Sequence, residues 1–173
     1  MTSGTSLYLR FAAVLFVGAI LQLGFFAQVR VVGVSPDILL VIAIAGGLVG
    51  GEWRGAVGGF FAGLTLDLLV YGRPFGLAML VYSLVGLLVG RFSASATGRS
   101  ATGEVALAAV ASALAVVAYD LGGRMLTGNT VLPEPLPVVA LVVAGWTALF
   151  IIPVRRIMRW VWSDPERISS WAR

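Results

Sequence analysis

Residues 59–76 read GFFAGLTLDLLVYGRPFG, and this stretch decides how the rest of the chain is interpreted. It combines glycines and bulky apolar residues without a polar face, which is typical of a helix buried in lipid or among other helices. Asp67 nevertheless lies inside it, with leucine on both sides. A carboxylate at the centre of a membrane span costs at least ~2.5 kcal/mol, and such residues are functional candidates by default. Asp67 is therefore the first candidate functional residue.

The composition of the whole chain indicates a membrane protein. Hydrophobic residues make up 59% of the 173 residues and charged residues 12%, whereas soluble domains have about 45–50% apolar and about 25% charged residues. The chain has no cysteine and no histidine, which removes disulfides, thiolate metal sites and the usual neutral-pH general base. We therefore expect no metal and no cofactor. The basic residues are arginines scattered between apolar runs, and this pattern argues against nucleic-acid binding.

Six apolar segments are candidates for membrane spans, which need ~17–25 residues. They lack the period-2 alternation of barrel strands, so we expect helices. The sequence thus predicts an all-α integral membrane protein, with residues 1–173 forming one compact bundle of six transmembrane helices. A short cytoplasmic tail is expected at 161–173. The expected spans are about 7–28, 37–51, 55–71, 75–90, 105–126 and 138–160.

The arginines predict the orientation of this bundle. With six spans, both termini lie on one side, together with nine arginines, whereas the other side has only Arg30, Arg73 and Arg124. Because cytoplasmic loops carry an excess of basic residues, both termini are expected in the cytoplasm. The nine arginines are Arg10, Arg54, Arg91, Arg99, Arg155, Arg156, Arg159, Arg167 and Arg173.

The carboxylates of the predicted spans lie toward the opposite, outer end. Asp37 opens the second span and is expected to be a helix N-cap, while Asp120 and Arg124 have the i,i+4 spacing of a local ion pair. Asp67 is the stronger candidate for a functional or partner-contact role. The candidate outer-mouth residues are Asp37, Asp67, Asp120, Arg73, Arg124 and Gln22.

Glycines four residues apart predict close helix contacts. Gly55, Gly59 and Gly63 form one slanted stripe that advances ~40° per step, and Asp67 continues it at the edge. Small residues at this spacing let two helix backbones approach closely. Gly86 and Gly90 repeat the spacing on a neighbouring segment. The alternative is that these glycines reflect composition alone.

Two aspartates within spans also invite comparison with intramembrane aspartyl proteases, in which paired carboxylates activate water. Those proteases carry a glycine two residues before the second aspartate, and their tyrosine-aspartate pair comes first. Here the pair Tyr119-Asp120 comes second, after Asp67. We therefore expect no enzyme activity.

Residues 22–91 carry a family resemblance. The motifs that carry this resemblance are the start of the second expected span and a glycine-rich segment that ends in aspartate and leucine. The residues are Gln22, Pro36-Asp37-Ile38-Leu39-Leu40, Arg54-Gly55, Gly58-Gly59-Phe60, Gly63-Leu64, Asp67-Leu68, Gly72, Phe75-Gly76 and Gly90-Arg91. This order resembles MreD, the rod shape-determining membrane protein of bacteria.

The resemblance implies a non-catalytic scaffold of cell-wall elongation in the bacterial cytoplasmic membrane. MreD-like proteins act with the bitopic protein MreC and, through it, with RodA, a penicillin-binding transpeptidase and MreB filaments. The implied fold is similar to the S components of energy-coupling-factor vitamin transporters. The alternative function is therefore a vitamin-binding transporter subunit, whose solute site would use polar groups at the outer mouth.

Overall fold

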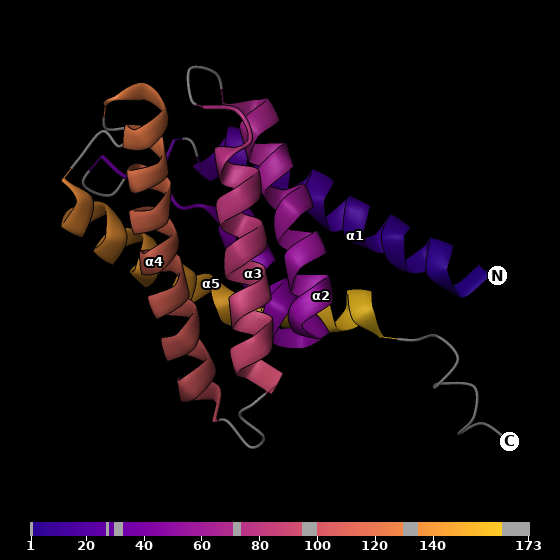
Figure 1. Cartoon of the computed structure of the whole chain (residues 1–173). Coiled ribbons are helices and arrows are strands. Elements are labelled where there is room, and N and C mark those ends of the chain that lie inside the picture. Colours follow the sequence, from indigo (N-terminus) through magenta and orange to yellow (C-terminus); the bar gives the residue numbers. More distant parts are fainter. Residues whose placement is uncertain are drawn as a thin grey trace, which may run out of the picture.

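The computed structural model describes residues 2–26, 28–29, 33–70, 74–94, 100–129 and 135–163. The regular elements in these ranges are helical, as the sequence predicts (Figure 1). They are five α-helices and one short π-helix: α1 (Thr2–Leu21), η1 (Gln22–Phe26), α2 (Ile38–Leu69), α3 (Leu77–Ala94), α4 (Ala101–Thr127) and α5 (Leu136–Trp162).

The expected count of six spanning helices is not supported. Within the described ranges, four stretches are long and apolar enough to cross a membrane: Ser6–Phe26, Ile38–Leu69, Ala101–Thr127 and Leu136–Trp162. The apolar helix Leu77–Ser93 is shorter. α2 covers most of the second and third expected spans, and its two halves follow each other at Gly51 without an intervening loop. At the other end of the chain, α5 includes residues 161 and 162 of the expected tail, and 164–173 lie outside the described residues.

The break at Gly51 turns α2 back on itself. The backbone there has φ 77° and ψ −171°, far from helical values. A Cβ atom placed on Gly55 would lie 2.7 Å from the Cα of Gly47, although residues eight apart in a straight helix are separated by about 12 Å. The two halves of α2 therefore meet beside the break. Only glycine adopts this conformation readily, so Gly51 determines the reversal.

We expect Gly51→Ala to destabilise the protein by about 1–3 kcal/mol, because alanine is strained at this φ and ψ. The cause is conformational and not steric, since a Cβ atom at this position meets nothing within 4 Å. The measurement is the thermal unfolding midpoint of the purified protein in detergent. Gly145→Ala in α5 is the matched control, because its Cβ also meets nothing within 4 Å while helix propensity favours alanine by about 1 kcal/mol. Equal midpoints for the two variants would contradict the strain argument.

The second half of α2 packs on α3 through contacts between backbones. A Cβ atom on Gly59 would lie 2.6 Å from the carbonyl carbon of Tyr82, and one on Gly63 would lie 2.5 Å from the Cα of Met79. Real Cβ atoms essentially never approach so closely, so larger residues would force the helices apart. We call this contact the α2–α3 seam. The structure places on it the five glycines expected at helix contacts: Gly55, Gly59, Gly63, Gly86 and Gly90.

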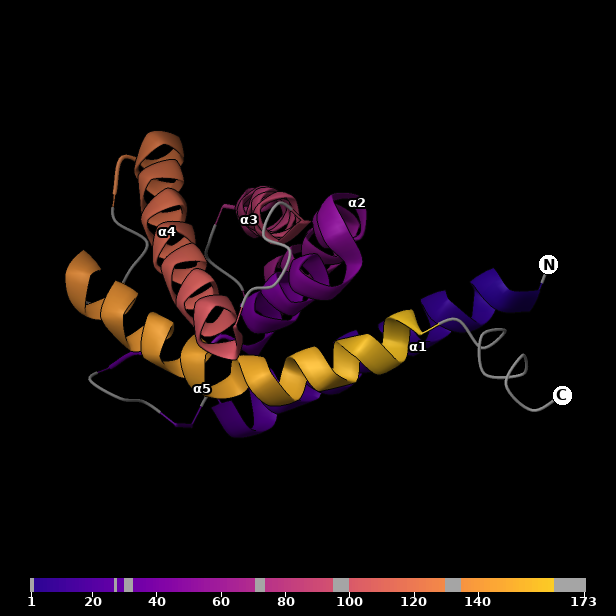
Figure 2. The same ribbon diagram turned by 90° about the horizontal axis from the view of Figure 1, so that it is seen from below.

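The other helices pack against the pair formed by α2 and α3. α1 and α5 lie on one side of α2, α3 and α4 and cross them at a steep angle (Figures 1 and 2). Ser100 caps the start of α4, and Gly128 ends it in a left-handed conformation. Phe26 of η1 packs edge to face on Phe150 of α5, with ring centroids 5.3 Å apart. The largest fully buried apolar side chains come from α2 and α5: Leu39, Ile44, Ile151 and Met158.

Candidate functional site

The starts of α2 and α3 and the end of α4 lie close together, and we call this region the polar end. The start of α3 contacts α4, because Gly122 lies against the side chain of Leu77. The start of α2 contacts α3 through a hydrogen bond between Asp37 and Tyr82. The polar end consists of Gln22 in η1, Asp37 before α2, Asp67 near the end of α2, Tyr82 in α3, and Asp120 and Arg124 in α4.

Asp67 caps a helix to which it does not belong. Its Oδ2 atom accepts hydrogen bonds from the backbone N–H groups of Gly76, at 3.0 Å, and Met79, at 3.2 Å. Both groups lie at the start of α3, where the first N–H groups have no partner within the helix. A carboxylate there also complements the positive end of the helix dipole. Asp67 thus ties the end of α2 to the start of α3, which accounts for a carboxylate inside the apolar stretch 59–76.

Asp37 is the N-cap residue of α2. Its Oδ1 atom accepts a hydrogen bond of 3.1 Å from the backbone N–H of Leu40, and its Oδ2 atom accepts one from the hydroxyl of Tyr82. Tyr82 is buried in α3 on the α2–α3 seam. The same carboxylate therefore satisfies the start of α2 and links it to α3.

Gln22 joins the end of the first helical stretch to the start of α2. Its side-chain Nε2 donates to the carbonyl oxygen of Pro36 at 3.0 Å, and its Oε1 accepts from the backbone N–H of Ile38 at 3.0 Å. The two bonded residues, Pro36 and Ile38, flank Asp37 in the sequence. Gln22 occupies the first position of the π-helix η1, a kind of element that often occurs at functional sites. One amide thus clamps the backbone at the entrance to α2.

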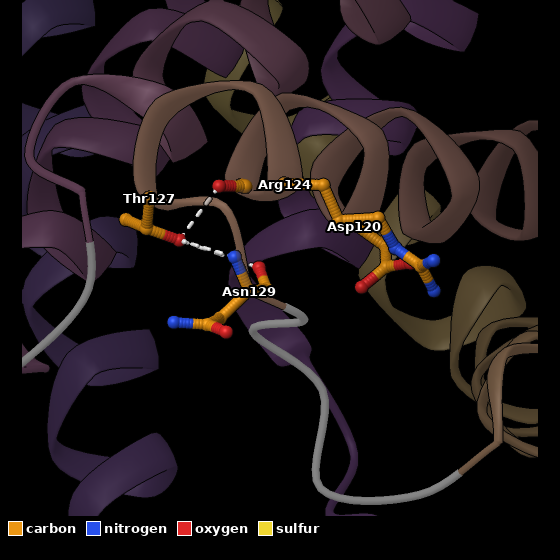
Figure 3. Close-up of polar contacts among 5 residues, drawn as sticks. Asp120, Arg124, Thr127 and Asn129 are labelled. Carbon is orange, nitrogen blue, oxygen red and sulfur yellow. Dashed lines mark hydrogen bonds and ion pairs between the residues drawn. The ribbon is translucent and has the colours of Figure 1, made fainter.

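Asp120 and Arg124 form the ion pair that their i,i+4 spacing predicts (Figure 3). The Nε atom of Arg124 lies 2.7 Å from Oδ2 of Asp120. The Asp120 side chain is buried, whereas that of Arg124 is about half exposed, at 51%. The Oδ1 atom of Asp120 has no hydrogen-bond partner in the part of the chain that the structure describes. Arg124 therefore neutralises a buried carboxylate from a position at the surface of the bundle.

The C-terminal end of α4, next to this ion pair, is stabilised by local hydrogen bonds. The hydroxyl of Thr127 donates to the carbonyl oxygen of Gly123 at 2.8 Å and accepts from the backbone N–H of Asn129 at 3.4 Å (Figure 3). These bonds satisfy backbone groups at the helix end. They hold Arg124 on an ordered turn next to Asp120.

The candidate residues fall into two groups. Gln22, Asp37 and Asp67 bond to backbone at helix starts, while Asp120 pairs with Arg124. Among the described residues, Asp67 has no ion pair, and Arg73 lies outside them. The described chain also holds no cluster of three or more acidic residues placed to bind a metal ion.

Sequence reasoning missed the partner of Asp67. The available signal lies in the turn before α3, where Pro74, Phe75 and Gly76 offer no side-chain oxygen to cap the helix. Serine, threonine, asparagine or aspartate normally fills that role. A helix start without its own acceptor predicts that one comes from elsewhere.

Comparison with known proteins identifies the family. No curated protein and no solved structure matches the chain, so the expected similarity to transporter S components has no support from known structures. A family model described as rod shape-determining protein MreD matches residues 5–161, nearly the whole chain. Together with helices that are long and apolar enough to cross a membrane, this match shows that the chain belongs to the MreD family of rod shape-determining proteins.

Proposed function

We propose that this protein is a non-catalytic membrane scaffold that binds the single transmembrane helix of MreC. The observation that carries the proposal is that the side chains of Gln22, Asp37 and Asp67 at the polar end form hydrogen bonds with backbone groups at the starts of helices. Polar atoms used in this way stiffen a framework and do not turn over a substrate. Through MreC the scaffold acts with RodA, its penicillin-binding transpeptidase and MreB filaments, and so supports peptidoglycan synthesis.

The location that fits this function is the bacterial cytoplasmic membrane with both termini in the cytoplasm. Arg10, Arg54 and the arginines at the end of α5 gather at the end of the bundle opposite the polar end. Basic residues favour the cytoplasmic side of a membrane. The polar end then faces outward, toward the compartment in which the wall is built.

The surface that we assign to MreC is the outward face of α1. Phe11, Leu15 and Gly18 turn toward the bundle, and the opposite face is exposed. Its residues recur at alternating steps of four and three, the spacing at which two helices interlock side chains. They are Leu9, Ala13, Phe16 and Ile20 in α1, followed by Leu23 in η1. A single apolar helix lying along α1 would bury this seam.

Replacing both Phe16 and Ile20 by alanine is expected to reduce the amount of MreC that co-purifies from membranes by about 30-fold or more. Truncating two anchoring side chains at the centre of a helix contact commonly removes more than about 1 kcal/mol of binding energy each. The measurement is the MreC-to-scaffold ratio after affinity purification in mild detergent. Val110→Ala with Leu114→Ala in α4 is the matched control, because both side chains are also apolar and exposed.

If the α4 variant loses MreC as strongly as the α1 variant, α1 is not the docking helix. If neither variant loses MreC, the assigned face is wrong. The alternative transporter function has a separate test, which is mass spectrometry of small molecules released from protein purified without added ligand. A stoichiometric vitamin would favour the transporter and would argue against the scaffold.

A further inference from the structure

Arginines and tryptophans gather where α1, the break in α2 and the end of α5 meet. The ring of Phe11 stacks on that of Trp162, with centroids 5.6 Å apart, and so joins α1 to α5. Arg54 of α2 lies over the same indole. We call this region the arginine surface. It consists of Arg10, Arg54, Trp160 and Trp162, together with Arg156 and Arg159, which lie on the last turns of α5 beside Trp160 and Trp162 in sequence.

The arginine surface carries positive charge that no described carboxylate neutralises. Glu52 pairs with Arg91, with Nη1 and Oε2 3.4 Å apart, and Glu104 pairs with Arg155. These two pairs occupy the described glutamates of this end. Among the described residues, no ion pair involves the four arginines that remain: Arg10, Arg54, Arg156 and Arg159.

Tryptophans hold two of these arginines in place. The Cζ atom of Arg10 lies 5.0 Å from the ring centroid of Trp160, and that of Arg54 lies 5.1 Å from the centroid of Trp162. A guanidinium group stacked on an indole keeps its N–H donors free at the edge, where they can meet an anion. Trp160 is itself 56% exposed. Tryptophans of membrane proteins concentrate at the headgroup level, which places the arginines at the same depth.

We infer that the arginine surface binds the phosphate groups of anionic phospholipids in the leaflet at this end of the bundle. Like charges gathered on neighbouring turns repel one another, and anionic headgroups relieve that repulsion. The planar fork of arginine matches the geometry of a phosphate. The surface is also the meeting point of α1, α2 and α5, so a bound headgroup would stabilise the contact among these three helices.

The test is lipid binding by the full chain in detergent, titrated with short-chain phosphatidylglycerol and followed by native mass spectrometry. Arg10→Gln and Arg54→Gln are each expected to weaken phosphatidylglycerol binding about fivefold, and the double variant about 25-fold. Binding to the wild type is expected to weaken as salt rises, because partly exposed charges are screened. Phosphatidylcholine and inorganic phosphate are the comparison ligands, and both are expected to bind far more weakly than phosphatidylglycerol.

Arg91→Gln is the matched control, because it removes one positive charge from the same end while Arg91 already has a carboxylate partner in Glu52. It is expected to change phosphatidylglycerol binding by less than about twofold. An equal loss in Arg91→Gln and Arg10→Gln would overturn the proposal, since net charge alone would then explain binding. So would equal binding of phosphatidylcholine, equal binding of inorganic phosphate, or binding that salt does not change. Unfolding midpoints of the lipid-free variants verify that each protein is folded.

Discussion

Gly59→Leu is expected to prevent the α2–α3 seam from forming, with a loss of more than about 3 kcal/mol, beyond the usual cost of overpacking. A Cβ atom at this position would lie 2.6 Å from the carbonyl carbon of Tyr82 and 2.9 Å from the backbone nitrogen of Ser83. Both obstacles are backbone atoms, so no side-chain rotation relieves the contact. Because folded proteins are stable by only about 5–15 kcal/mol, much of the protein should aggregate. The measurement is the monodisperse fraction in size-exclusion chromatography, together with the unfolding midpoint of that fraction.

Gly145→Leu in α5 is the control for Gly59→Leu. Gly145 is an exposed helical glycine, and a Cβ atom there meets nothing within 4 Å. Leucine favours the helix over glycine by about 0.5–1 kcal/mol, so this variant should be as stable as the wild type or more stable. A Gly59→Leu protein that elutes and unfolds like the wild type would show that α2 and α3 do not approach each other as described.

The glycine contacts could be predicted from the sequence because they depend on local spacing. Residues four apart lie on one helix face whatever the rest of the fold does, and Gly55, Gly59 and Gly63 do lie against α3. The Asp120–Arg124 ion pair could be predicted for the same reason, since both partners lie on one helix. Asp37 followed from a capping preference that concerns only its immediate neighbours.

The features that the sequence did not predict depend on tertiary structure or on one backbone angle. Nothing in the apolar pattern indicates that Gly51 reverses α2 without a loop, so the count of helices was too high. The two hydrogen bonds of Gln22 join positions 14 and 16 residues away. The role of Asp67 requires that α3 begin beside the end of α2, and these two helix ends come together only when α2 and α3 pack on each other in the folded protein.

Asp67→Leu is expected to destabilise the protein by about 2–4 kcal/mol, because two N–H groups at the start of α3 lose their acceptor. Asp67→Asn keeps a side-chain oxygen in the same place and loses only the charge, so it should cost about 1 kcal/mol or less. Unfolding midpoints in detergent measure the two costs. Amide hydrogen exchange shows which part of the structure is destabilised. Asp67→Leu should speed exchange at the first turn of α3 and leave exchange in the middle of α4 unchanged.

The comparison of these two variants separates a helix cap from a charged contact site. If the oxygen atom that bonds Gly76 and Met79 is what matters, asparagine substitutes for aspartate and leucine does not. If the negative charge is what matters, because Asp67 attracts a cation on MreC or elsewhere in the chain, both variants fail alike. MreC co-purification measured on the same samples completes the argument: a cap predicts that Asp67→Asn retains MreC, and an Asp67→Asn protein that is stable but loses MreC would assign the carboxylate to the partner.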